Sequence, residues 1–202
     1  MNEVILSGMF RNVQHSHTIN NIEYDKADIV VARKNGVEDV LPLKFKKFSN
    51  KYTEGQNIEL TGNLRSYSTR RPDGTNKVEL YVFTYFDIPQ TDEQDHIITN
   101  SVRISGRVCK VDMPRIDSKG KESVHFILAN NIQINKTGTK IDTYIPCICV
   151  DATAQSAEEL HVGDAIEIRG ELHSNVYKKY LPNGEMELRT AHTVFVTGFV
   201  RI

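Results

Sequence analysis

A tandem repeat constrains this sequence more than any other feature. Residues 4–8 recur as residues 102–106, 98 positions later, and residues 55–64 recur as residues 163–172, 108 positions later. The offset grows along the chain, as it does after a duplication whose second copy has slightly longer loops. We therefore expect two copies of one fold, a first domain at 1–88 and a second at 100–202. The polar, acidic segment 89–99 between them is typical of a linker.

Each copy has a β-strand pattern, because apolar and polar residues alternate in runs separated by turn residues. Five such runs are found in each half, and residues 152–160 of the second half predict a helix between the third and fourth strands, capped by Asp151. This order is that of the OB-fold, a five-stranded Greek-key barrel. The predicted fold is all-β: two tandem five-stranded OB-fold barrels, each with its own sheet, the second with a short helix.

Two residue types have expected places in such barrels. Glycine is expected where a strand bends at a crowded corner, and alternatively it only marks strand ends. The glycines in matching repeat positions are Gly8, Gly62, Gly106 and Gly170. Proline cannot donate a ladder hydrogen bond, so Pro42 and Pro146 are expected at equivalent places, where the third strand has an unpaired edge or a bulge.

The second half resembles the bacterial single-stranded DNA-binding protein family. The residues that carry the resemblance are Asn100, Val102, Ile104, Gly106 and Arg107 in the first strand, residues 144–147 in the third, and residues 162–164 and 168–172 around the fourth. Over residues 2–86 the resemblance rests mainly on the repeat. It implies sequence-tolerant binding of single-stranded DNA by four OB-folds, which a homodimer of this chain would supply.

Three positions depart from the family pattern. Val150 and Asp151 stand where an aromatic residue and an arginine are usual at the end of the third strand, and Met9 follows Gly8. The sequence stops at Ile202 inside its last strand, so we expect no acidic C-terminal tip for recruiting replication partners.

Binding without sequence preference needs aromatic faces for bases and cations for phosphates. The hairpins between the fourth and fifth strands place tyrosine beside paired cations in both copies, and each closes with a Pro-Asp-Gly or Pro-Asn-Gly turn. The candidates there are Tyr67, Arg70, Arg71, Lys77, Tyr177, Lys178, Lys179 and Tyr180. The alternative is a solvated hairpin whose tyrosine packs on its own partner strand.

Weaker candidates lie elsewhere in the two copies. They are Phe45, Lys46 and Phe48 at the end of one third strand, Tyr144 in the other, and the cations Arg11, Arg107, Lys110 and Arg115 near the first strands. If Phe45 is a core residue, its cluster is only an amphipathic strand. Single exposed cations usually serve only for solvation.

Composition limits the remaining function classes. A net charge of −1 requires any basic surface to be local. The three cysteines favour buried thiols over disulfides. No apolar run is long enough for a membrane helix, so we expect a cytoplasmic, nucleoid-associated protein. Segment 15–17 (His-Ser-His) lacks a further ligand at metal spacing, and no nucleotide-binding or nucleophile motif is present. We expect no enzymatic activity, no metal and no cofactor.

The favoured function is single-stranded DNA binding in replication, recombination or repair, including that of a mobile element. Two alternatives stay open. One is a protein-interaction module of a replication or conjugation complex without strong DNA affinity, and the other is an RNA-binding OB-fold protein.

Overall fold

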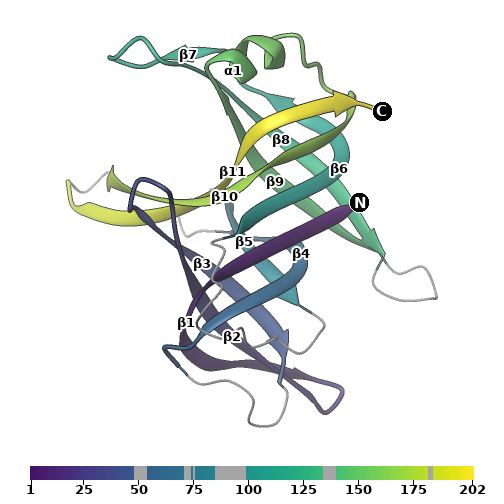
Figure 1. Ribbon diagram of the computed structural model, residues 1–202, viewed down its shortest axis with the longest axis vertical. Helices are drawn as coiled ribbons and strands as arrows, with labels where there is room; N and C mark the ends of the chain where they lie inside the picture. The colour runs from purple at the N-terminus through teal and green to yellow at the C-terminus, as the bar shows by residue number, and fades with distance from the viewer. Residues whose placement is uncertain (48–53, 71–73, 75, 85–98, 134–139, 182–183) are drawn as a thin grey trace.

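The computed structural model describes residues 1–47, 54–70, 74, 76–84, 99–133, 140–181 and 184–202, and these are almost entirely β-structure (Figure 1). The strands of the first half are β1 (Asn2–Ile19), β2 (Ile22–Ala32), β3 (Glu38–Lys46), β4 (Asn57–Arg70) and β5 (Asn76–Thr84). Those of the second half are β6 (Asn100–Val111), β7 (Arg115–Ile116), β8 (Glu122–Gln133), β9 (Lys140–Val150), β10 (Ala165–Tyr180) and β11 (Met186–Arg201), with helix α1 (Ala152–Ala157) after β9.

The same cycle of strand pairings occurs in each half. In the first half β1 pairs with β2 and β4, β3 pairs antiparallel with β2 and parallel with β5, and β5 pairs with β4. In the second half β6, β8, β9, β11 and β10 repeat this pattern, including the parallel pair β9–β11. The strand order therefore follows the repeat found in the sequence. The two-residue strand β7, which pairs with β8, is an addition that the sequence did not predict.

The two halves are joined through their first strands. β1 pairs antiparallel with β6, and Val4 lies opposite Val102, its own counterpart in the repeat. The halves are thus related by an approximate twofold axis near this pair, and β1 and β6 lie side by side at the centre of Figure 1. The prediction of a separate sheet in each half is wrong, because this ladder makes one continuous sheet of eleven strands.

Asn2 and Asn100 have the same structural role in the two copies. The Asn2 side-chain amide donates to the Leu64 carbonyl and accepts from the Leu64 N–H, both at 2.8 Å. Asn100 makes the same two bonds with Leu172, also at 2.8 Å. Each side chain therefore extends the ladder between the first and fourth strands of its half, and satisfies backbone groups that would otherwise need water.

The prolines lie at matching places. Pro42 faces Asp28 of β2, one residue before the parallel β3–β5 pairing begins at Leu43. Pro146 lies one residue before the parallel β9–β11 pairing begins at Cys147. Their predicted equivalence at a partly unpaired edge of the third strand is confirmed.

The helix differs from its prediction in length and in capping. α1 ends at Ala157 rather than at residue 160, and Asp151 makes no side-chain cap. The backbone angles of Asp151 (φ 52°, ψ −128°) lie outside the β region that a capping residue adopts, and its carboxylate lies 3.4 Å from the ammonium of Lys121. The corresponding segment of the first half falls largely on residues 48–53, outside the described part of the chain.

The core consists of the inward-facing residues of the alternating strands. Its largest fully buried members include Phe10, Phe45, Leu60, Ile104 and Ile166. Burial of a side chain of this size contributes about 1.5–3 kcal/mol. The predicted buried thiols are confirmed for two cysteines, Cys147 and Cys149, whereas Cys109 is exposed. Within the described residues, no helix is long and apolar enough to cross a membrane.

Candidate nucleic-acid interface

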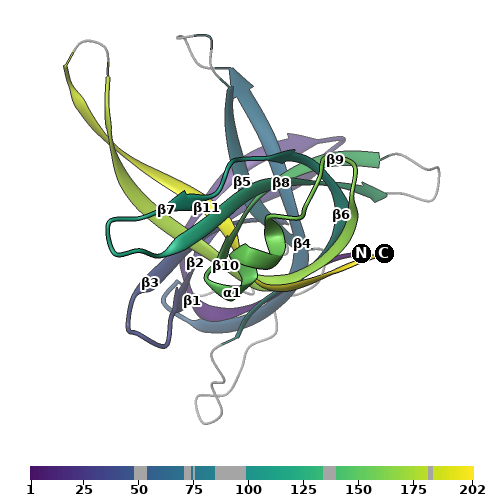
Figure 2. The same ribbon diagram turned by 90° about the horizontal axis from the view of Figure 1, so that it is seen from above.

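A groove of about 1250 Å³ runs between the two halves. One wall comes from β1 to β5 of the first half, and the other from β10 and β11, with Pro146 of β9. The β10–β11 hairpin projects far beyond the body of the molecule in Figures 1 and 2. Its base lies along the first half, so residues far apart in sequence share one surface.

The first-half wall contains a lysine held by two tyrosines. The ammonium of Lys44 lies 4.4 Å from the ring centroid of Tyr67 and 4.4 Å from that of Tyr81. The two rings are 5.8 Å apart, and the Tyr67 hydroxyl donates to the Glu79 carboxylate. Burial, followed by this hydrogen bond, raises the pKa of Tyr67 to about 12. Burial also lowers the pKa of Lys44. The cluster therefore presents neutral phenols and a partly desolvated cation to the groove.

The second-half wall combines an aromatic ring with polar side chains. Tyr177 is 44% exposed and lies directly opposite Arg189 on the neighbouring strand. Arg189 is ion-paired with Glu187 at 2.7 Å. His192 donates from Nε2 to the Val40 carbonyl at 3.0 Å, and burial lowers the pKa of this imidazole.

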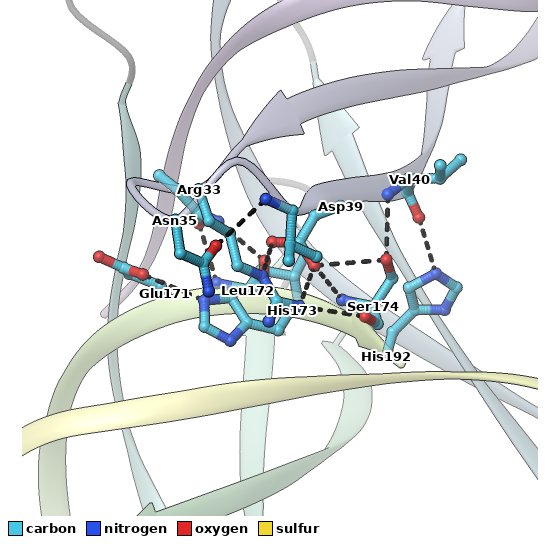
Figure 3. Close-up of polar contacts among 11 residues, drawn as sticks. Arg33, Asn35, Asp39, Val40, Glu171, Leu172, His173, Ser174 and His192 are labelled. Atoms are coloured by element: carbon cyan, nitrogen blue, oxygen red, sulfur yellow. Dashed lines mark hydrogen bonds and ion pairs between the residues drawn. The ribbon is translucent and has the colours of Figure 1, made fainter. Parts of the chain in front are cut away.

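A buried carboxylate fixes this wall against the first half (Figure 3). Asp39 is fully buried and receives two bonds from the Arg33 guanidinium, at 2.6 and 2.7 Å. It also accepts from the Ser174 N–H of β10 at 2.6 Å, and Arg33 donates to the Ser174 carbonyl at 3.1 Å. Burial alone would raise the pKa of Asp39, but the bonds from Arg33 and Ser174 outweigh it and lower the pKa.

A related contact lies at the matching place in the other copy. The Val40 N–H donates to the Ser174 hydroxyl at 3.0 Å, and the Tyr144 N–H donates to the Ser66 hydroxyl at 2.8 Å. Both bonds cross between the halves. The two halves are therefore held together by paired contacts on the two sides of the approximate axis.

Each of the two predicted hairpins contributes one tyrosine to the groove. Tyr67 and Tyr177 both line the groove. Tyr67 also packs on its own partner strand, since Glu79 faces it in the β4–β5 ladder. The other hairpin candidates in the described residues lie outside the groove: Arg70, Lys178 and Tyr180 are exposed, and Lys179 is half-buried.

The structure corrects the interpretation of Phe45 as a nucleic-acid-binding residue. It is fully buried, and its ring packs 5.9 Å from that of Phe10, so it has no face for a base. Lys46 next to it is exposed at the end of β3. Phe48 and Arg71, and the side chain of Lys77, lie outside the described part of the structure.

The remaining candidates do not line the groove. Arg11 is exposed and its guanidinium contacts the Met9 sulfur. Arg107 donates to the Gly163 carbonyl at 3.1 Å. Tyr144 is 48% exposed on β9.

Lys110 and Arg115 share one carboxylate in the second half. The Lys110 ammonium is 2.7 Å from Asp112, and the Arg115 guanidinium is 3.5 Å from it. These two candidates are therefore partly neutralised within the protein.

The sequence did not single out three groove residues, Lys26, Tyr81 and Arg189. Strand alternation gives a signal for Tyr81, because it is two residues from Glu79, the partner of Tyr67, and so shares its face of the sheet. Arg189 has no such local signal, since its place depends on the packing of one half against the other. The groove also contains the carboxylates of Asp28, Glu79 and Glu187.

Comparison with known proteins shows that solved structures have a similar fold. No protein-family model matches the chain, and no curated protein matches it. The wild-type single-stranded DNA-binding protein of Thermus aquaticus is similar over 100% of this chain and 93% of its own, with a TM-score of 0.74 and 18% identity. A deletion and point variant of that protein gives 0.73, with 18% identity and coverage of 100% and 94%. The chain thus has an OB-fold architecture similar to that of these two structures.

Proposed function

We propose that this protein binds single-stranded DNA with little sequence preference. The observation that carries the proposal is the groove between the halves, where Tyr67 and Tyr177, one from each hairpin, stand with Lys44 and Tyr81. The fold likeness to the Thermus aquaticus proteins supports it. The cycle of pairings in each half supports two OB-fold barrels, whose second and third strands are a common face for oligonucleotides.

Binding would combine two interactions. Bases stack on the tyrosine rings, and each stacked base contributes about 1–3 kcal/mol. Phosphates meet the groove cations, and release of counterions from the strand makes affinity depend on salt. Neither interaction reads a base edge, so poly(dT) and mixed sequences should bind alike.

A homodimer is the assembly that we propose, since it would supply four OB-folds. Replication, recombination or repair is the proposed setting, with the nucleoid as the proposed location. The groove carboxylates of Asp28, Glu79 and Glu187 favour one rival, a protein-interaction module with weak DNA affinity, because they reduce the positive charge that phosphates would meet.

A titration separates the proposal from its rivals. The intact protein is added to fluorescein-labelled poly(dT), poly(U) and duplex DNA at two salt concentrations, and anisotropy is measured. We expect tightest binding to poly(dT), weakened by salt. Preference for poly(U) would favour an RNA-binding protein, and no binding to any of the three would favour the interaction module.

A further inference from the structure

The repeat gives the lysines and tyrosines of the first-half wall counterparts in the second half. Lys26 and Lys44 lie directly opposite each other on β2 and β3. Counting from the equivalent prolines, Pro42 and Pro146, the matching pair on β8 and β9 is His125 and Ile148, which also lie directly opposite each other. The second half therefore has no lysine at either place.

The stacking residues differ between the copies in the same way. Leu64 faces Val82 in the first half, and Leu172 faces Val194 in the second. This match makes Asn175 the counterpart of Tyr67. It likewise makes Thr193 the counterpart of Tyr81, so the second half lacks both rings that hold Lys44.

The Lys26–Lys44 pair is costly in the protein alone. Like charges directly opposite on neighbouring strands destabilise a sheet. Neither ammonium forms an ion pair with any residue that the structure describes. Burial lowers the pKa of Lys44, the charge of Glu79 opposes this shift, and the charge of Lys26 makes a smaller contribution that adds to it. A phosphate between the two lysines would remove the repulsion. The arrangement is that of a site for an anion.

The corresponding surface of the second half is smaller and less charged. Its cavity, which includes Pro146 and His125, has a volume of about 180 Å³. Burial, followed by the charge of Arg115, lowers the pKa of His125 and so favours the neutral imidazole. Lys110 at its edge is already paired with Asp112.

We propose that the two copies have specialised: the strand's phosphates are held by Lys26 and Lys44 of the first half, and the second half adds only its hairpin wall. The inference rests on the proposed function, because it assigns that function to one half. It also places phosphate binding in the first half, whereas the sequence resemblance to the single-stranded DNA-binding protein family is clearer in residues 100–202.

Two double variants matched in charge test this assignment. Lys26→Gln with Lys44→Gln removes two positive charges from the first-half face, and Lys110→Gln with Arg115→Gln removes two from the second half. Binding of the full-length chain to labelled oligo(dT) is measured from low to high salt, with circular dichroism as a check on folding. We expect the first variant to flatten the slope of log affinity against log salt by about 1.4, at roughly 0.7 per phosphate contact on a single strand. We expect the second to leave the slope unchanged.

The outcomes distinguish this inference from the proposed function. An equal change in both variants, or a larger change in the second, would overturn the specialisation while leaving single-strand binding intact. A wild-type protein without measurable affinity for oligo(dT) would overturn the proposed function itself. If the first variant loses structure, the single variant Lys26→Gln, at an exposed position, should still flatten the slope by about 0.7.

Discussion

A side chain at Gly170 would collide with the backbone of the neighbouring strand. A Cβ built there meets the carbonyl oxygen of Phe195 on β11, next to a bulge in the β10–β11 ladder. The matching glycines Gly8, Gly62 and Gly106 have the same environment, and at Gly62 the oxygen is 2.7 Å away. Their predicted role at crowded corners is confirmed. Close approach of two backbones, rather than an unusual φ angle, is the reason that these positions are glycine.

Substitution at Gly170 should therefore destabilise the protein, with Gly198 as the matched control. Both lie in long strands of the second half, but a Cβ at Gly198 meets nothing within 4 Å. We expect Gly170→Ala to lower the free energy of unfolding by about 1–3 kcal/mol, the usual cost of overpacking. Gly198→Ala should change it by less than about 0.5 kcal/mol, because the added methyl group meets no neighbouring atom. Urea denaturation followed by circular dichroism measures both. Equal effects would mean that crowding is not the cause.

The β10–β11 hairpin presents a tyrosine on each of its two faces. Successive residues of a strand point to opposite sides, so Tyr177 and Tyr180 lie on different faces of the ribbon. Tyr177 lines the groove, whereas Tyr180 does not and is 73% exposed. The face of Tyr180 also carries Val176, which is exposed. Of the two tyrosines, only Tyr177 therefore faces the groove.

These two tyrosines should respond differently to truncation. Tyr177→Ala removes a stacking face from the groove, and we expect it to weaken binding to oligo(dT) by about 1–3 kcal/mol, with little change in salt dependence. Tyr180→Ala removes an exposed ring of the same type outside the groove, and its affinity should remain close to that of the wild type. A loss at Tyr180 as large as that at Tyr177 would place the strand on both faces of the hairpin.

At the level of elements, sequence predicts what depends on local pattern. The alternation of apolar residues predicted the strands, and the turn residues predicted both hairpins. The parallel pairing of β3 with β5, which brings Lys44 close to Tyr67 and Tyr81, joins strands distant in sequence, and its register has no local signal. The burial of Phe45 depends on which face of β3 turns inward. A phenylalanine between two lysines favours burial of its own face, which was the alternative interpretation of this cluster.

At the scale of the whole molecule, the two halves contact each other directly. The β1–β6 ladder joins the halves at their centre, and the Asp39 contact joins them again beside the groove. The sequence could not reveal either junction, because both depend on surfaces that each copy would expose if it were alone. The Asp39 contact has no equivalent in the second half, because the position that corresponds to Asp39 is occupied there by Thr143, which is also buried.

Unfolding should accordingly be a single transition that depends on Asp39. We expect the wild-type protein to unfold in urea with coincident circular dichroism and tyrosine fluorescence changes, the signature of one cooperative unit. Asp39→Thr installs the second-half residue and leaves Arg33 without its buried partner. It should cost about 3 kcal/mol, in the range for breaking a buried ion pair. The control Asp142→Thr alters an exposed carboxylate of β9 and should cost less than about 0.5 kcal/mol.

The pH dependence of unfolding gives this test a second readout. Because the folded state lowers the pKa of Asp39, its contribution is fully present above the ordinary aspartate pKa of about 3.9 and is lost as the pH falls through the lower, folded-state value. The difference in stability between wild type and Asp39→Thr should therefore be constant from neutral pH to about pH 5 and shrink at more acidic pH. Two separate transitions in the wild type, or a difference that grows on acidification, would show that Asp39 does not couple the halves in this way.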